Sequence, residues 1–347
     1  MTNQINVLMT GAGAPGGPGI IKALQQSERI NLIVADADEQ ASGRFLNKVF
    51  EQLPKANNDD FISEIIRLCN KHVVHIVFPL VTNELFQFAK HKDEFLSLGI
   101  KVIVSDDHML QLANNKRKLY EHLSSQGILV PEFYVVNSLE EFKIAASKLG
   151  YPNQEFCFKP SVSNGSRGFR IISDSVNEHE LLFKMKPNAT YMSYDKALAV
   201  LSSQAFPELL LTEFLPGEEY TIDTMVKNGA PQIILPRKRL QMREGISIKG
   251  EFVNDNDIIQ YCRHILQSLN LHGPIGIQVK RAVDGTFKIL EINPRIQGTS
   301  VAALGLGINL PLMAVSQELD EELAPLPKEI KWGTKFVRYY QEVFYRE

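Results

Sequence analysis

An acid, an amide and an arginine follow one another at intervals of two residues in the segment Leu290-Glu-Ile-Asn-Pro-Arg295. Glu291 and Asn293 alternate along an apolar strand, so both side chains point to one face. Two oxygen ligands this close together suit a hard cation such as Mg²⁺. Together with Arg295, that cation would neutralise charge that develops on a transferred phosphoryl group. A strand that ends in an Asn-Pro turn with a surface arginine would also account for the segment.

Lys159 ends the apolar strand Phe156-Cys-Phe-Lys, and a loop of small residues from Ser161 to Gly168 follows it. The backbone N–H groups of such a loop could approach phosphates while the lysine supplies a point charge. An ammonium group beside apolar strand residues also requires a partner, and a triphosphate is one. Further on, residues 209–223 predict two strands separated by a break at Pro216-Gly217, whose free backbone groups could contact an adenine edge.

A glycine-rich turn near the N-terminus supports a competing interpretation. The segment Gly11-Ala-Gly-Ala-Pro-Gly16 matches G-x-G-x-x-G between a strand and a helix, and Asp36 ends the next strand. By itself this pattern predicts an oxidoreductase that binds NAD or NADP. The signal is weak, because any ligand held against a helix N-terminus benefits from such a turn.

These motifs require a regular series of elements to position them. Strands at 5–10, 31–35, 73–78 and 101–104, with helices between them, predict a parallel sheet. A further helix is expected at 116–125, where Gly127 stops it. The aromatic and charged tail from 324 to 347 is expected to pack as closing strands or a helix.

Taken in order, the motifs make the chain resemble the ATP-grasp superfamily, particularly the branch with the carbamoyl-phosphate synthase large subunit, biotin carboxylase and amino-acid ligases. The resemblance runs from about Ile5 to about Ala314. It implies a fold of α/β and α+β class with an N-terminal Rossmann-like parallel-sheet lobe (1–112), a small lid lobe (113–202) and a C-terminal antiparallel-sheet lobe with an extension (203–347). ATP would lie between the last two lobes.

The same resemblance implies which residues bind ATP. Lys116 and Lys159 would hold the phosphates, the loop after Lys159 would close over them, and the backbone of Glu213 and Leu215 would contact the adenine. The full predicted set is Lys116, Lys159, Ser161, Ser163, Gly165, Ser166, Gly168, Glu213, Phe214, Leu215, Glu219 and Gln278. Without the flanking motifs, Lys116 would be read as a solvated charge on a helix, and Glu219 as part of a solvated turn.

The resemblance also implies a metal site and a reaction. Gln278, Glu291 and Asn293 match the metal-ligand pattern, with Glu291 bridging two Mg²⁺ ions, for which Mn²⁺ could substitute. Arg295 matches the arginine on the phosphate side. A carboxylate would attack the γ-phosphate of ATP to give an acyl phosphate and ADP, and an amine would then displace phosphate. Lys159, the metal ions and Arg295 would hold the transition-state charge.

A cationic segment is the main candidate for substrate binding. Residues 236–243 contain Arg237, Lys238, Arg239 and Arg243. Arginine binds carboxylate and phosphate oxygens in a bidentate manner, so Arg237 and Arg243 are predicted to hold the carboxylate or the acyl phosphate. A solvated hairpin edge would give the same composition.

Composition agrees with a cytoplasmic enzyme. The 347 residues suit two or three subdomains, and 44% hydrophobic content without an apolar stretch near twenty residues predicts neither a membrane span nor an export signal. A net charge of −3 without a basic stripe disfavours nucleic acid as a partner. The expected partners are small carboxylate and amine substrates, with a homodimer as a state common among similar enzymes.

Two further expectations concern the range of possible functions. A single module with neither a tandem copy nor a biotin-carrier segment disfavours carbamoyl phosphate synthesis and carboxylation. A nucleotide-binding regulatory protein with a degenerate site is the other alternative, which the presence of the expected lysines, acids and arginine disfavours.

Overall fold

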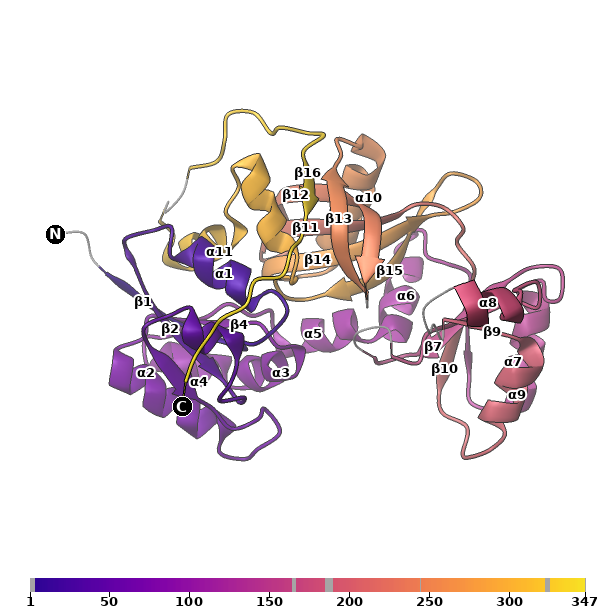
Figure 1. Cartoon of the computed structure of the whole chain (residues 1–347), viewed down its shortest axis with the longest axis horizontal. Coiled ribbons are helices and arrows are strands. Elements are labelled where there is room, and N and C mark those ends of the chain that lie inside the picture. Colours follow the sequence, from indigo (N-terminus) through magenta and orange to yellow (C-terminus); the bar gives the residue numbers. More distant parts are fainter. Residues whose placement is uncertain (1–3, 164–166, 185–189, 244, 322–324, 347) are drawn as a thin grey trace. The chain divides into compact units, whose positions relative to one another are not determined.

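The computed structural model describes residues 4–163, 167–184, 190–243, 245–321 and 325–346 (Figure 1). The chain forms two compact units. The first contains residues 1–113, 219–278 and 291–347, and the second contains residues 114–218 and 279–290. Each unit therefore combines segments that are far apart in the sequence.

The first unit begins with a five-stranded parallel sheet in the order β3-β2-β1-β4-β5. Its apolar strands are buried along most of their length, as expected where helices cover a parallel sheet. The strands are β1 (Ile5–Thr10), β2 (Ile30–Asp36), β3 (Phe50–Gln52), β4 (Ile76–Pro79) and β5 (Lys101–Val102), and the helices are α1 (Gly17–Leu24), α2 (Phe61–His72), α3 (Thr82–Lys90), α4 (Lys92–Ser97) and α5 (Asp107–Asn114).

This parallel sheet was predicted, and β1 has the predicted bounds. The strand predicted at 73–78 begins only at Ile76. Val73 is the C-cap of α2 and has a left-handed backbone with φ of 49°. That conformation ends the helix, so the chain becomes extended only after it.

A six-stranded sheet, most of which belongs to the first unit, has the order β15-β14-β11-β12-β13-β16, with antiparallel pairing from β11 through to β16. Apolar residues of α1, α11 and β11 pack in one core with the parallel sheet. The elements are β11 (Glu219–Lys227), β12 (Ala230–Arg243), β13 (Ile246–Phe252), β14 (Gly273–Arg281), β15 (Phe287–Asn293), β16 (Lys335–Val337), α10 (Asn256–Ser268) and α11 (Leu310–Leu319), with short 3₁₀ helices η1 (Ser42–Phe45) and η2 (Ser300–Leu306).

The C-terminal segment closes the first unit. The closing strand predicted in the tail is β16, which pairs with β13. Beyond it the chain runs back to the parallel sheet as an extended trace (Figure 1), where Gln341 accepts a hydrogen bond from Lys22 at 3.0 Å. Tyr345 then stacks on Phe45 with ring centroids 4.3 Å apart.

The second unit has a mixed five-stranded sheet in the order β6-β10-β7-β8-β9. Aromatic residues around Phe142 fill its core. The elements are β6 (Phe133–Val136), β7 (Phe156–Pro160), β8 (Arg170–Ile172), β9 (Tyr191–Met192), β10 (Leu209–Glu213), α6 (Lys116–Ser125), α7 (Leu139–Lys148), α8 (Glu178–Lys184) and α9 (Tyr194–Leu201).

Two sequence predictions bear on this unit. The helix α6 has the predicted bounds and begins after Asn115, whose side chain accepts a hydrogen bond from the backbone of Lys118. Strand β10 was grouped with the C-terminal lobe on sequence, whereas it pairs with β6 and β7 in this sheet. The three-lobe division with boundaries at 112 and 202 stays a prediction.

The predicted fold class is confirmed, since the chain combines a parallel α/β sheet, a mixed sheet and an antiparallel sheet. Over the described parts of the chain, no helix by itself has the length and apolar character needed to cross a membrane. One bent pair, Ser300–Leu306 with Leu310–Leu319 at 97°, meets those two criteria when its members are joined.

Candidate functional site

Three strands of the antiparallel sheet bring two predicted ATP ligands together. Arg239 on β12 forms an ion pair with Glu219 on β11, and its Nη1 lies 3.4 Å from Oε1 of Gln278 on β14. The Arg239 side chain is 4% exposed. Glu219 is therefore held in a charged cluster and is not a solvated turn residue. Sequence reasoning did not select Arg239, although it lies two residues from Arg237 on the same strand.

The predicted metal ligands on β15 lie side by side. Asn293 Nδ2 is 3.2 Å from Oε1 of Glu291, so both side chains occupy one face of the strand, as their alternation predicted. No group of three or more His, Cys, Asp or Glu side chains that could hold a metal occurs in the described ranges. A divalent cation at this position would therefore depend on Glu291 and on amide oxygens, which is a donor set that Mg²⁺ accepts.

Arg295 follows these ligands and is partly buried. Its Nε donates to Oγ1 of Thr82 at 3.1 Å and its Nη1 donates to the carbonyl of Ile296 at 2.8 Å. Burial lowers the pKa of Arg295, while the negative charge of Glu291 acts in the opposite direction. The guanidinium is thus fixed by the chain beside the predicted metal ligand.

The two predicted phosphate lysines are both buried in the second unit. Lys116 is 6% exposed and Lys159 is 8% exposed. Lys116 donates from its backbone to the carbonyl of Ser161 at 2.9 Å, and from Nζ to the carbonyl of Ser163 at 3.0 Å. The solvated-surface interpretation of Lys116 is therefore wrong, because this side chain holds the start of the small-residue loop.

The loop itself is only partly described. Ser161 is buried and Ser163 accepts from Lys116, whereas the predicted ligands Gly165 and Ser166 lie outside the described residues. Gly168 ends the loop with φ of +77°, and a Cβ atom there would lie 2.6 Å from Cδ of Pro160. Glycine is required at this position both by backbone conformation and by space.

The predicted adenine segment is braced by its side chains. The Glu213 carboxylate accepts from Nζ of Lys288 at 2.6 Å and from the backbone N–H of Glu132 at 2.7 Å. Leu215 is buried, and Nζ of Lys280 lies 5.1 Å from the centre of the Phe214 ring. Because the Glu213 side chain has this structural role, a contact to adenine would fall to the backbone, as the resemblance implied.

Arg237 has no exposed surface and lies in a buried polar cluster. Its Nε donates to Oδ2 of Asp223 at 3.1 Å and its Nη2 to Oγ1 of Thr299 at 2.7 Å. Ser300 Oγ donates to the other oxygen of Asp223 at 2.7 Å. Within the described part of the chain, Nη1 of Arg237 has no hydrogen-bond partner. A buried donor without a partner is costly, so an anionic ligand would be stabilised there.

The structure does not place Arg243 with Arg237. Arg243 is exposed, and its Nη1 lies 3.4 Å from Oη of Tyr340 in the C-terminal segment. The two arginines are six residues apart on β12, which corresponds to about 20 Å along a strand. They cannot bind the same carboxylate in this arrangement.

The glycine-rich turn is explained by packing. The backbone N–H of Gly13 donates to Oδ2 of Asp36 at 2.7 Å, so this acid holds the turn itself. A Cβ atom on Gly16 would lie 2.5 Å from Cα of Gly298, in the loop that follows Arg295. The glycines thus allow close approach of two backbones, and the pattern needs no dinucleotide to account for it.

Glu84 lies at the same end of the parallel sheet and was not singled out on sequence. It is buried on α3 and accepts a hydrogen bond from Oγ1 of Thr10 at 2.5 Å. Burial raises the pKa of Glu84 to about 7, the Thr10 hydrogen bond opposes this, and the charge of Asp36 adds to it. A helical acid after a strand is too common for its burial to be foreseen from sequence.

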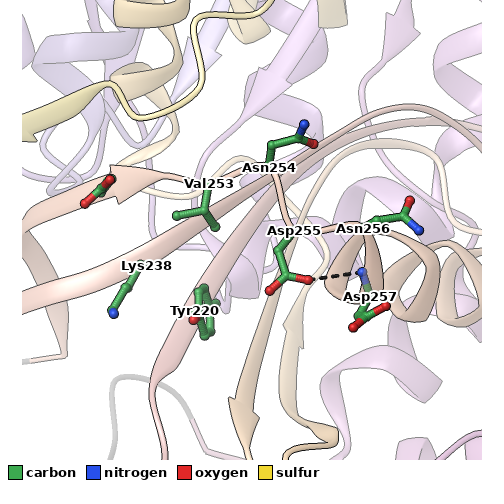
Figure 2. A pocket seen from close by; sticks show the side chains of 8 residues that line it. Tyr220, Lys238, Val253, Asn254, Asp255, Asn256 and Asp257 are labelled. Atoms are coloured by element: carbon green, nitrogen blue, oxygen red, sulfur yellow. Dashed lines mark hydrogen bonds between the residues drawn. The ribbon is translucent and has the colours of Figure 1, made fainter.

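An open polar pocket of about 490 Å³ lies elsewhere on the first unit (Figure 2). Tyr220 of β11 and Lys238 of β12 pair across the strands and alternate with Thr221 and Arg237. They therefore face away from the Arg237 cluster. The pocket is lined by Tyr220, Lys238, Glu251, Val253, Asn254, Asp255, Asn256 and Asp257, and is not part of the candidate site.

The three sheets and the motifs they carry define a protein of ATP-grasp architecture. Residues 205–337 match the family model described as ATP-grasp in the biosynthetic pathway with Ter operon. Residues 7–103 match the model of the PylC-like N-terminal domain. These matches confirm the predicted resemblance to the ATP-grasp superfamily.

Individual relatives agree with this. The chain is 26% identical over 257 residues to the carbamoyl phosphate synthase large chain of Archaeoglobus fulgidus, covering 71% of this chain and 22% of that protein. It thus spans about a fifth of the length of that relative. Two solved structures share the fold. They are N5-carboxyaminoimidazole synthetase from Staphylococcus aureus complexed with ADP (TM-score 0.71, 16% identity, 96% of this chain and 81% of that chain) and L-amino acid ligase from Bacillus licheniformis (TM-score 0.64, 15% identity, 92% and 74%).

Proposed function

We propose that the protein is an ATP-dependent carboxylate–amine ligase that works through an acyl phosphate and releases ADP and phosphate. The observation that carries the proposal is the burial of Lys116, which contacts the small-residue loop, and of Lys159, which precedes that loop in the sequence. Two buried ammonium groups close to one loop concentrate positive charge there, and this charge would stabilise the phosphate groups of ATP. The match to a family model described as ATP-grasp supports the same reaction class.

The remaining predicted ligands would complete the nucleotide site. In this proposal the loop from Ser161 to Gly168 covers the phosphates, the backbone from Glu213 to Leu215 contacts adenine, and Glu219 contacts the ribose. Glu291, Asn293 and Gln278 would bind Mg²⁺, which when bound supplies positive charge to the phosphate oxygens. The number of ions stays a prediction.

Arg237 is the proposed anchor for the carboxylate substrate, because its buried Nη1 has no hydrogen-bond partner among the described residues. A carboxylate oxygen would attack the γ-phosphorus while the bond from that phosphorus to the ADP oxygen breaks. The amine nitrogen would then attack the acyl carbon, and phosphate would leave. Lys159 and Arg295 would hold the charge on the phosphoryl oxygens through both steps.

The test measures ADP and phosphate release with ATP and Mg²⁺ across pooled carboxylates and amines. Release that requires an added carboxylate and is abolished in Glu291→Ala is the expected result. Glu251→Ala is the matched control, since Glu251 lines the pocket on the opposite face. If no pool stimulates release and the protein does not bind ATP, the ligase function is excluded. The homodimer and the cytoplasmic location stay predictions.

A further inference from the structure

The hydroxyl group of Tyr120 lies at the centre of a buried hydrogen-bond cluster in the second unit. Tyr120 is on α6 and has no exposed surface. Its Oη donates to the carbonyl oxygens of Ile289 and Leu290, each at 3.0 Å. Lys159 Nζ donates to the same Oη at 3.2 Å and to the carbonyl of Leu290 at 3.2 Å. A phenol can donate and accept at once, so this hydroxyl can serve both the lysine and the main chain.

The position of this hydroxyl is set by packing. The Tyr120 ring meets Phe133 edge-on with centroids 5.5 Å apart, and Lys159 Nζ lies 5.4 Å from the centre of the Tyr120 ring. A lysine has a flexible stem, so its ammonium group stays in place only where other groups restrain it. Here a rigid aromatic residue and a strand carbonyl provide the restraint.

We propose that Tyr120 is a positioning residue for Lys159. Its hydroxyl holds the ammonium group to the main chain at Ile289 and Leu290, immediately before Glu291 in the sequence. The inference rests on the proposed function, in which Lys159 stabilises charge on the transferred phosphoryl group. Donors that are already oriented contribute more to a transition state than donors that must be ordered during the reaction.

Tyr120→Phe tests this because it keeps the ring and removes only the hydroxyl. We expect kcat for carboxylate-stimulated ADP release to fall about tenfold while KM for ATP changes less than about threefold, since a charge that is misplaced affects the transition state more than binding. In the Lys159→Ala background, Tyr120→Phe should have no further effect on kcat. If the hydroxyl had only a structural role, Tyr120→Phe would lower kcat by the same factor in the parent and in the Lys159→Ala variant.

A second measurement needs no nucleotide. The rate at which an amine-directed reagent labels Lys159, followed by mass spectrometry, should rise several-fold in Tyr120→Phe, because the ammonium loses an acceptor. Tyr134→Phe is the matched control, since it removes a hydroxyl that donates to Oε1 of Glu132 at 2.8 Å in the same unit. It should leave both kcat and labelling at parental values.

The two proposals fail in different ways. If Lys159→Ala retains parental turnover, the phosphate role of Lys159 in the proposed function is wrong, and the labelling rate alone decides whether Tyr120 restrains the lysine. If Lys159→Ala is inactive while Tyr120→Phe matches the parent in kcat and labelling, the positioning role is overturned and the proposed function stands.

Discussion

The buried ion pair between Asp223 and Arg237 allows a quantitative test of the site. Neither side chain has exposed surface, and Arg237 Nε lies 3.1 Å from Asp223 Oδ2. Asp223→Ala would leave the guanidinium buried without its carboxylate. It would also remove the acceptor of the 2.7 Å hydrogen bond from Ser300.

The expected cost follows from this burial. Removing one partner of a buried ion pair leaves an uncompensated charge and lowers the free energy of unfolding by about 3–5 kcal/mol. The lost Ser300 hydrogen bond places Asp223→Ala toward the upper end of that range. The double variant Asp223→Leu with Arg237→Met removes both charges, so it should recover most of the loss, because apolar replacements of buried pairs are often close to neutral.

Urea unfolding followed by tryptophan fluorescence measures these changes. Trp332 is the single tryptophan and packs against the core of the first unit, so it reports on the unit that holds the pair. Asp255→Ala is the control, since it removes the N-cap of α10 and should lower the free energy of unfolding by about 1 kcal/mol. A loss below about 1 kcal/mol for Asp223→Ala, or an equal loss in the double variant, would refute the reasoning.

Three further predictions test other parts of the chain. Glu84 has a pKa raised from 4.5 to about 7, so between these pH values the folded protein keeps a proton that the unfolded chain releases. The free energy of unfolding should therefore fall by roughly 3 kcal/mol from pH 4.5 to 7 and then level off. Urea unfolding measured across that range should show a smaller dependence on pH in Glu84→Gln. Gly168→Ala should accelerate proteolysis near the loop more than Gly127→Ala does. Both glycines have positive φ, but only at Gly168 would the added Cβ atom clash with Pro160, so equal rates of proteolysis would contradict the steric argument. Arg243→Ala should keep kcat/KM for the carboxylate within about twofold, whereas Arg237→Lys should lower it at least about tenfold, since lysine cannot reproduce the fork of donors.

Local sequence patterns predicted several features of the fold. The bounds of β1 and α6 follow from an apolar run and from an Asn N-cap, which act within a few residues. The placement of Glu291 and Asn293 on one face follows from strand alternation alone. The ordered motifs were also sufficient to predict the ATP-grasp fold, because each motif depends on residues close together in the chain.

Tertiary structure decided which charged residues share a site. Register shifts interrupt β12 between Arg239 and Gln241 and between Gln241 and Met242, so alternation along the chain does not give the direction of Arg243. The burial of Lys116 and Glu84, and the contacts of Arg239 with Glu219 and Gln278, depend on segments far apart in sequence. Local periodicity fixes which way a side chain points from its own strand. Only the pairing of strands that are distant in the sequence fixes which residues that side chain contacts, because this pairing is set by packing of the whole unit.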